Sequence, residues 1–158
     1  MKISKQLCGV AGEYYVAAEI SRRGFLAAIT LRNSDGVDIL VSNIAGNNIF
    51  SIQVKTTQNK RKWIFNKKIE NEKSEHKYFV FVNIPENLDF QPEYYIIKST
   101  ILSTNIYNGH RMWLKQTGKN GLIRNDSDAR QFDPKYYEKE DLLTWNSLIE
   151  IISQDENK

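Results

Sequence analysis

Three short runs of strand-forming residues follow one another in the first third of the chain, and they constrain the possible fold more than any other feature. The runs cover residues 25–31, 37–42 and 49–57. The turn-forming segments Asn33-Ser34-Asp35-Gly36 and Ala45-Gly46-Asn47-Asn48 separate them. Connections of this length join antiparallel neighbours, so the sequence predicts an antiparallel meander of three strands.

A helix is expected immediately before this meander, over residues 5–23. Its apolar residues recur every three or four positions, and Gly24 follows them as a stop signal. Small residues, Gly12 among them, would let the helix lie close against a sheet. Glu13 falls on the flank of the apolar stripe, so its carboxylate is expected to be partly buried or to face along a groove.

The second half of the chain also alternates between strands and helices. Further strands are predicted at residues 63–65, 78–84 and 94–98. A second helix is expected over residues 99–114, with Trp113 among its apolar positions. Asp133-Pro134 has the residue types of an N-cap and a first helical turn, and it predicts the start of a last helix.

Together these patterns predict one α/β domain over residues 1–152, with a mixed central β-sheet flanked by helices, followed by a frayed tail over 153–158. Cys8 is the only cysteine, which excludes an internal disulfide, and with two histidines it does not make a tetrahedral zinc site. No apolar run approaches the roughly 18 residues of a membrane span, and no hydrophobic signal core is present. A cytoplasmic protein without membrane contact is expected.

Positive charge is concentrated in the first half of the chain. The net charge is +3, but residues 1–77 hold 13 Lys and Arg against 7 Asp and Glu, whereas residues 78–158 hold 9 against 12. Such segregation suits a polyanion bound over one face, and random surface charge is the alternative. Candidate phosphate contacts are Lys60, Arg61, Lys62, Arg22 and Arg23. A solvated loop is the alternative for the first three.

Polar side chains occur on the second and third strands of the predicted meander, among apolar neighbours. Alternation places Asp38 and Leu40 on one face of the second strand, and Gln53 and Lys55 on one face of the third. With Glu13 on the preceding helix, carboxylate, amide and ammonium groups can converge on one divalent cation. Such oxygen ligands suit a hard metal ion, and a neighbouring lysine suits the activation of an attacking water.

Each of these residues taken alone has an ordinary structural explanation. Asp38 can be satisfied by backbone amides, Lys55 can be an exposed strand-end lysine, and Glu13 can be solvated. Their order and spacing together favour a functional site.

In the order helix with Glu, strand with Asp, strand with Gln-x-Lys, the chain resembles the PD-(D/E)xK nuclease superfamily, and most closely its small resolvase-like and Mrr-like branches. The matching segments are Gly12-Glu13, Val16-Ala17-x-Glu19-Ile20-x-x-x-Gly24-Phe25, Gly36-Val37-Asp38-Ile39-Leu40-Val41 and Ile52-Gln53-Val54-Lys55-Thr56. They lie within residues 9–57, and beyond them only the general layout agrees.

The resemblance implies a restriction-endonuclease-like fold with an αβββαβ core, and a Mg²⁺-dependent endonuclease that hydrolyses DNA phosphodiester bonds with metal-activated water. It implies Asp38, Gln53, the Val54 backbone carbonyl and Glu13 as metal ligands, with Mn²⁺ able to replace Mg²⁺. Asp38, Gln53 and Glu13 would form the catalytic set with Lys55, the catalytic lysine. A homodimer is left open.

Gln53 stands where the superfamily usually has Glu or Asp. Its amide oxygen can coordinate Mg²⁺ but brings no charge, a loss that Glu13 can offset, and the Mrr-like branch resembles this chain in using Gln there. The alternative is a catalytically inactive nucleic-acid-binding module, or a subunit of a nuclease complex, with the same fold. RNA is a less favoured substrate than DNA, because nothing in the sequence indicates recognition of a 2′-hydroxyl.

Overall fold

The computed structural model describes residues 2–31, 36–118 and 121–154. Within them lie three α-helices: α1 (Lys5–Ser21), α2 (Ser99–Lys115) and α3 (Trp145–Gln154). The strands are β1 (Leu26–Ile29), β2 (Ile39–Ser42), β3 (Phe50–Gln58), β4 (Trp63–Asn66), β5 (Lys77–Ile84), β6 (Glu93–Lys98) and β7 (Ala129–Phe132). Short 3-10 helices include η1 (Lys67–Asn71), η3 (Pro134–Tyr136) and η4 (Lys139–Asp141).

Five strands form one mixed sheet in the order β1-β2-β3-β5-β6, and β4 pairs with β7 in a separate two-stranded sheet. β1, β2 and β3 are antiparallel neighbours, which confirms the predicted meander. β3 and β5 are parallel, with Gln53 beside Phe79 and Lys55 beside Phe81. A parallel pair needs a crossover connection, and β4 with η1 provides it. A 3-10 helix therefore stands where the expected αβββαβ order has its second α-helix.

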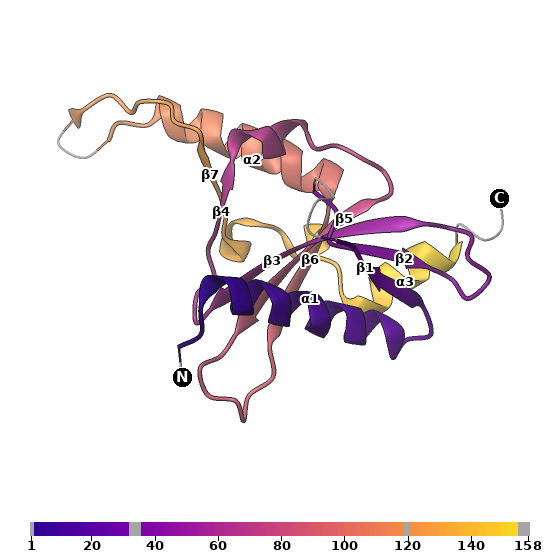
Figure 1. Ribbon diagram of the computed structural model, residues 1–158. Helices are drawn as coiled ribbons and strands as arrows, with labels where there is room; N and C mark the ends of the chain where they lie inside the picture. The colour runs from indigo at the N-terminus through magenta and orange to yellow at the C-terminus, as the bar shows by residue number, and fades with distance from the viewer. Residues whose placement is uncertain (1, 32–35, 119–120, 155–158) are drawn as a thin grey trace.

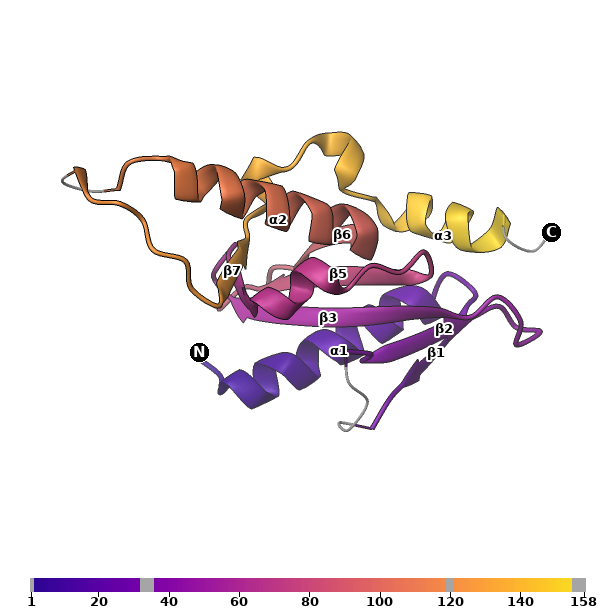
Figure 2. The ribbon, with the colours of Figure 1, turned by 90° about the horizontal axis from the view of Figure 1, so that it is seen from above.

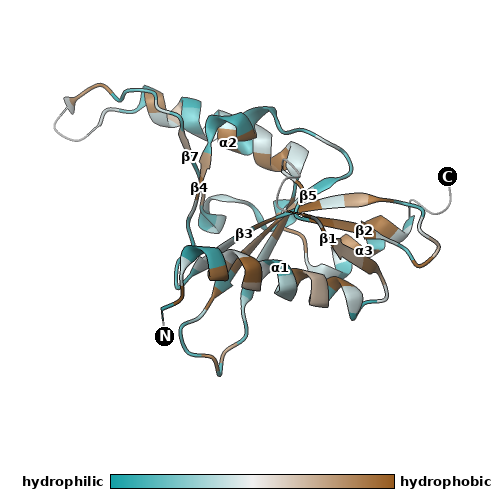
Figure 3. Ribbon diagram, in the orientation of Figure 1, coloured by the Kyte–Doolittle hydropathy of each residue, from teal (hydrophilic) through white to brown (hydrophobic). Residues whose placement is uncertain are grey.

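Helices cover both faces of the five-stranded sheet (Figures 1 and 2). α1 and α3 pack on one face, over a core that includes Val16, Ile52 and Leu148. α2, η1 and the β4–β7 ribbon lie on the other face, over a second core that includes Phe79 and Phe81. In Figure 3, β1 and β2 are largely brown, whereas the segment around η1 is teal. The predicted mixed sheet flanked by helices is confirmed. None of the helices in the described part of the chain is long and apolar enough to cross a membrane.

α1 lies so close to β3 that Gly12 has no room for a side chain. A Cβ atom there would stand 1.8 Å from Oγ1 of Thr56 and 2.9 Å from its Cβ. We therefore expect Gly12→Ala to push the helix away from the sheet and to lower the free energy of unfolding by about 1–3 kcal/mol, the usual cost of overpacking. Chemical denaturation measures this loss.

Gly9→Ala is the matched control for this prediction. A Cβ at Gly9 would have nothing within 4 Å, and replacing a helical glycine by alanine stabilises a helix by up to about 1 kcal/mol. An equal loss of stability in both variants would contradict the close contact between Gly12 and Thr56.

The predicted last helix is wrong in its starting point. Asp133 does cap a helical turn, with Pro at its first position, but that turn is only the 3-10 helix η3. The last α-helix begins at Trp145, directly after Thr144. The Thr144 hydroxyl accepts the backbone N–H of Ser147, in the first turn of that helix. The intervening segment does not continue as a helix because Tyr137 and Leu142 pack on the second core.

Other differences are smaller. β7 has no counterpart among the predicted strands, and Trp113 is 42% exposed instead of lying on a buried face. α3 includes Ser153, whose hydroxyl donates to the Ile149 carbonyl at 2.8 Å, so the helix extends into the expected tail. The rest of that tail, residues 155–158, and the turn residues Asn33-Ser34-Asp35 lie outside the described residues.

Candidate metal centre

Asp38 ends the pairing between β2 and β3. The paired residues reach Ile39 and Ile52, and the Asp38 N–H donates to the Ile52 carbonyl at 3.0 Å. The Asp38 Oδ2 atom then accepts the N–H of Val54 at 2.7 Å. The carboxylate thus takes the place of a backbone acceptor. This is the ordinary structural role that the sequence analysis gave as the alternative for Asp38, satisfaction by backbone amides. Because a carboxylate has two oxygens, Oδ1 is left for a further ligand.

The Val54 carbonyl points to the same edge of β3 as this hydrogen bond. The N–H and C=O groups of one strand residue face the same neighbouring strand, and the Val54 N–H faces Asp38. The pairing register of β2 with β3 reaches only as far as Ile39. The predicted backbone ligand and the predicted carboxylate ligand therefore lie at the same edge.

The Gln53 side chain is buried on the face that η1 and α2 cover. Its neighbours Ile52 and Val54 pack into the core under α1, so alternation directs Gln53 and Lys55 to the other face, as predicted. Gln53 is 9% exposed, and its Oε1 atom has no hydrogen-bond partner among the described residues. Leaving a buried acceptor unpaired costs about 1–3 kcal/mol. An ion or ligand at this oxygen would remove that cost.

These oxygens fit a hard divalent cation. Asp38 offers a charged carboxylate oxygen, Val54 a carbonyl and Gln53 an amide oxygen, which are ligand types that Mg²⁺ and Mn²⁺ accept. Over the ranges that the structure describes, no three acidic, histidine or cysteine side chains form a metal-binding group. A cation at this centre would therefore rely on neutral oxygens for part of its coordination.

Glu13 lies on the opposite side of the sheet from the Gln53 side chain. It follows Gly12, which approaches Thr56 on the face that α1 covers, and it is partly buried, as expected. The structure thus brings Asp38, Val54 and Gln53 to one place on β3. Glu13 as a further ligand stays a prediction.

Two charged residues that the sequence analysis did not single out lie beside Gln53. Gly36, with φ +71°, stands just before the Asp38 strand. A Cβ built on it would meet three side-chain atoms: Lys77 Nζ at 3.0 Å, Glu72 Oε2 at 3.7 Å and Gln53 Oε1 at 3.8 Å. Lys77 and Glu72 form an ion pair at 2.6 Å. No motif indicates them, because only the parallel pairing of β3 with β5 brings the start of β5 next to Gln53.

The candidate phosphate contacts on α1 have structural partners. Arg22 and Arg23 both pair with Glu19, and the Arg23 guanidinium lies 5.2 Å from the ring centre of Trp145. These contacts tie the end of α1 to α3. Arg22 is the more exposed of the two, so it has the freer side chain for a phosphate.

The basic run of Lys60, Arg61 and Lys62 lies at the surface, just after the C-terminal end of β3. Arg61 pairs with Glu93, and its guanidinium holds the pKa of that carboxyl below the usual range. Lys62 Nζ is 3.9 Å from a carboxylate oxygen of Asp133. Lys60 is exposed. The five predicted contacts therefore divide between two sets of partners, Glu19 for Arg22 and Arg23, and Glu93 and Asp133 for Arg61 and Lys62.

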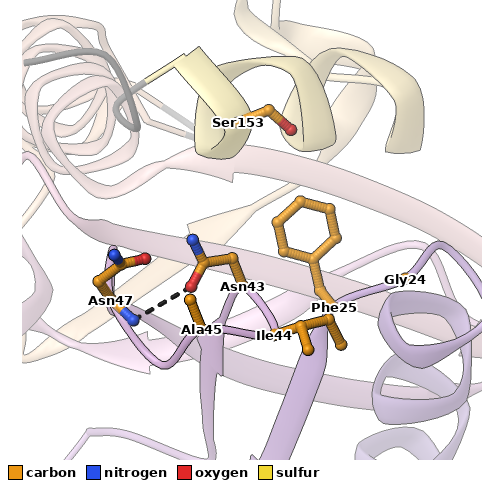
Figure 4. Close-up of a pocket in the computed structure, with 7 residues that line it drawn as sticks. All are labelled: Gly24, Phe25, Asn43, Ile44, Ala45, Asn47 and Ser153. Carbon is orange, nitrogen blue, oxygen red and sulfur yellow. Dashed lines mark hydrogen bonds between the residues drawn. The ribbon is translucent and has the colours of Figure 1, made fainter.

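A cavity of about 580 Å³ lies at the far end of β2 from Asp38 (Figure 4). The turn after α1, the β2–β3 connection and α3 surround it, and the Asn47 N–H donates to Asn43 Oδ1 at 3.1 Å. Its lining residues are Gly24, Phe25, Asn43, Ile44, Ala45, Asn47 and Ser153. None of these side chains titrates, so the cavity has no group for acid–base chemistry.

No family model, no curated protein and no solved structure matches the chain.

Proposed function

We propose that the protein is a Mg²⁺-dependent DNA endonuclease of the PD-(D/E)xK superfamily. The observation that supports this most strongly is the buried Oε1 atom of Gln53, which has no hydrogen-bond partner among the described residues. The Asp38 carboxylate lies next to it along β3, because it accepts the N–H of the following residue, Val54. Gln53 and Lys55 share one face of that strand, as the Gln-x-Lys pattern of such nucleases requires. DNA is the expected polyanion, and Mn²⁺ should replace Mg²⁺.

The residues of the centre would divide the work of phosphodiester hydrolysis. Asp38, Gln53 and the Val54 carbonyl would hold the ion. When bound, Mg²⁺ offsets negative charge on the scissile phosphate and lowers the pKa of a water molecule. The Lys55 ammonium would orient the attacking oxygen and stabilise the charge that develops on the phosphate.

A nucleic-acid-binding module without turnover is the second candidate function, and the crowding around Gln53 favours it. Gly36 and the Lys77–Glu72 ion pair lie close to the Gln53 amide oxygen. A phosphate that shares a metal ion with Gln53 would need part of this space. In that case the basic residues would bind the nucleic acid and no bond would be cut.

A cleavage panel separates the two candidates. Purified protein is incubated with linear, nicked, branched and single-stranded DNA, and with RNA, in Mg²⁺, Mn²⁺ or EDTA. We expect at least one DNA substrate to be cut with either ion and none in EDTA. Binding without cleavage on every substrate would favour the second candidate. Cleavage that persists in EDTA would contradict a metal-dependent reaction.

Neutralising Lys60, Arg61 and Lys62 together should weaken DNA binding to the same extent on every sequence. Each phosphate contact that is removed should reduce the slope of log affinity against log salt concentration by about 0.9. Arg61 already pairs with Glu93, so it should contribute less than Lys60. Fluorescence anisotropy over a salt series measures both quantities. Unchanged affinity and slope would place the run on a solvated face away from DNA.

A further inference from the structure

The connection between η1 and β5 brings a second carboxylate to the candidate centre. Glu72 Oε2 and Gln53 Oε1 lie 3.7 and 3.8 Å from the same point, the position of a Cβ on Gly36. Gly36 begins the stretch that leads into Asp38 and β2. Oxygen-bearing side chains from β3 and from the residue that follows η1 therefore lie at the stretch of chain that leads into Asp38.

Two buried serines of α2 fix the backbone that carries Glu72. The Ser103 hydroxyl donates to the Glu72 carbonyl at 3.0 Å. Ser99 accepts the Ser74 N–H and donates to the Ser74 carbonyl, both at 2.9 Å. Both serines are fully buried. The segment is thus anchored to a packed helix, and the Glu72 side chain, 34% exposed, starts from a fixed position.

The negative charge available to a divalent cation at the centre favours a role for Glu72. Gln53 is neutral, so with Asp38 alone the three oxygens of the centre on β3 bring one negative charge, the lower end of the one or two carboxylates through which Mg²⁺ is usually bound, and Glu72 would bring a second. Gln53 is nine-tenths buried and its Oε1 atom lacks a partner within the described chain, which indicates a ligand beside it. Lys77, 13% exposed, pairs with Glu72 at 2.6 Å, so it competes with any cation for that carboxylate.

We propose that Glu72 is a ligand of the same divalent cation as Asp38 and Gln53, and that it supplies the negative charge that Gln53 lacks; this rests on the metal-dependent function proposed above. Lys77 opposes the ion, because it holds the Glu72 carboxylate in an ion pair and adds a positive charge beside Gln53. The pair of Glu72 and Lys77, outside the Gln-x-Lys pattern, therefore adjusts the affinity for an ion that Asp38 and Gln53 also hold.

Mn²⁺ binding to the full chain tests this proposal, with the free ion followed by electron paramagnetic resonance. Glu72→Gln should weaken Mn²⁺ binding by about tenfold or more, since it removes a charged ligand. Lys77→Met should tighten binding, since it releases the carboxylate and removes a repelling charge. A pair with only a structural role would lower the melting temperature in both variants and leave Mn²⁺ affinity unchanged. That result would overturn the proposal.

Glu75→Gln is the matched control. Glu75 belongs to the same connection and pairs with Lys98 at 2.5 Å, but it is 70% exposed. Its variant loses one carboxylate and one ion pair, and Mn²⁺ affinity should not change. An equal loss of affinity in the Glu75 and Glu72 variants would show that the loss is a nonspecific effect of the removed charge, and it would overturn the proposal.

The outcomes also separate this proposal from the proposed function. Binding of Mn²⁺ that depends on Asp38 but not on Glu72 would overturn the role of Glu72 alone. Absence of Mn²⁺ binding by the unaltered protein would overturn the metal-dependent function itself. If Glu72→Gln does not fold, Lys77→Met decides the question, and an unchanged affinity in that variant would overturn the proposal.

Discussion

Asp38→Asn is expected to abolish DNA cleavage and divalent-ion binding while the protein stays folded. Asparagine keeps an oxygen that can accept the Val54 N–H, the bond that Asp38 makes at 2.7 Å, but it removes the negative charge that the ion needs. We expect the single-turnover rate to fall on the order of a thousandfold or more. Quenched-flow cleavage with enzyme in excess measures the rate, and calorimetry measures ion binding.

Comparison with Asp38→Ala separates the chemical role of Asp38 from its structural role. Alanine also leaves the Val54 N–H without its acceptor, which should cost about 1–3 kcal/mol of stability on top of the lost activity. Urea denaturation should therefore place Asp38→Asn near the unaltered protein and Asp38→Ala below it. Full cleavage activity in purified Asp38→Asn protein would show that this carboxylate serves only the backbone.

Lys55→Ala should cost far more in cleavage rate than in DNA affinity. A group that acts in the transition state lowers turnover and removes little ground-state binding. We expect a loss of about 10²–10⁴-fold in the single-turnover rate, the usual contribution of a positioned proton-transfer group. DNA affinity, measured in Ca²⁺ or without metal, should change by less than about tenfold.

Lys60→Ala is a suitable comparison, because Lys60 follows the same strand but is exposed beyond its end. Its variant should lose affinity most strongly at low salt, where a phosphate contact contributes most, and keep the single-turnover rate. The opposite pattern at Lys55, with binding lost and the rate per bound complex retained, would make Lys55 a phosphate contact. It would then favour the nucleic-acid-binding module over the nuclease.

Local patterns in the sequence predicted the strands that carry the centre. Alternation along β3 placed Ile52 and Val54 in the core and left Gln53 and Lys55 on the other face, because an alternation of apolar and polar residues is visible in a single strand. The short connections predicted the antiparallel pairing of β1, β2 and β3. The edge at which Asp38 and the Val54 carbonyl meet follows from these two features.

The features that the sequence did not predict depend on contacts between distant segments. Glu72 and Lys77 reach Gln53 only because β5 pairs in parallel with β3, and the pairing of β4 with β7 has no local signal. Trp113 follows a helical apolar spacing, yet the last turns of α2 project beyond the sheet, so that the ring has no core to enter (Figure 1).

The predicted start of the last helix at Asp133 is wrong for a similar reason, a contact between distant segments. Asp133-Pro134 is a strong local signal for a helix start, and it does cap a helical turn. Tyr137 and Leu142 then pack on the second core, and this tertiary contact outweighs the local preference.

The most direct test of the metal centre is a titration of Mn²⁺ into ¹⁵N-labelled protein, followed by NMR. Bound Mn²⁺ is paramagnetic and broadens the signals of the nearest nuclei first. We predict that the Gln53 side-chain amide and the Val54 backbone N–H lose intensity at the lowest ion concentrations, and that Asp38→Asn removes this effect. Earlier broadening at another acidic surface, such as that of Asp126, or the same broadening in Asp38→Asn, would contradict a metal centre on β3.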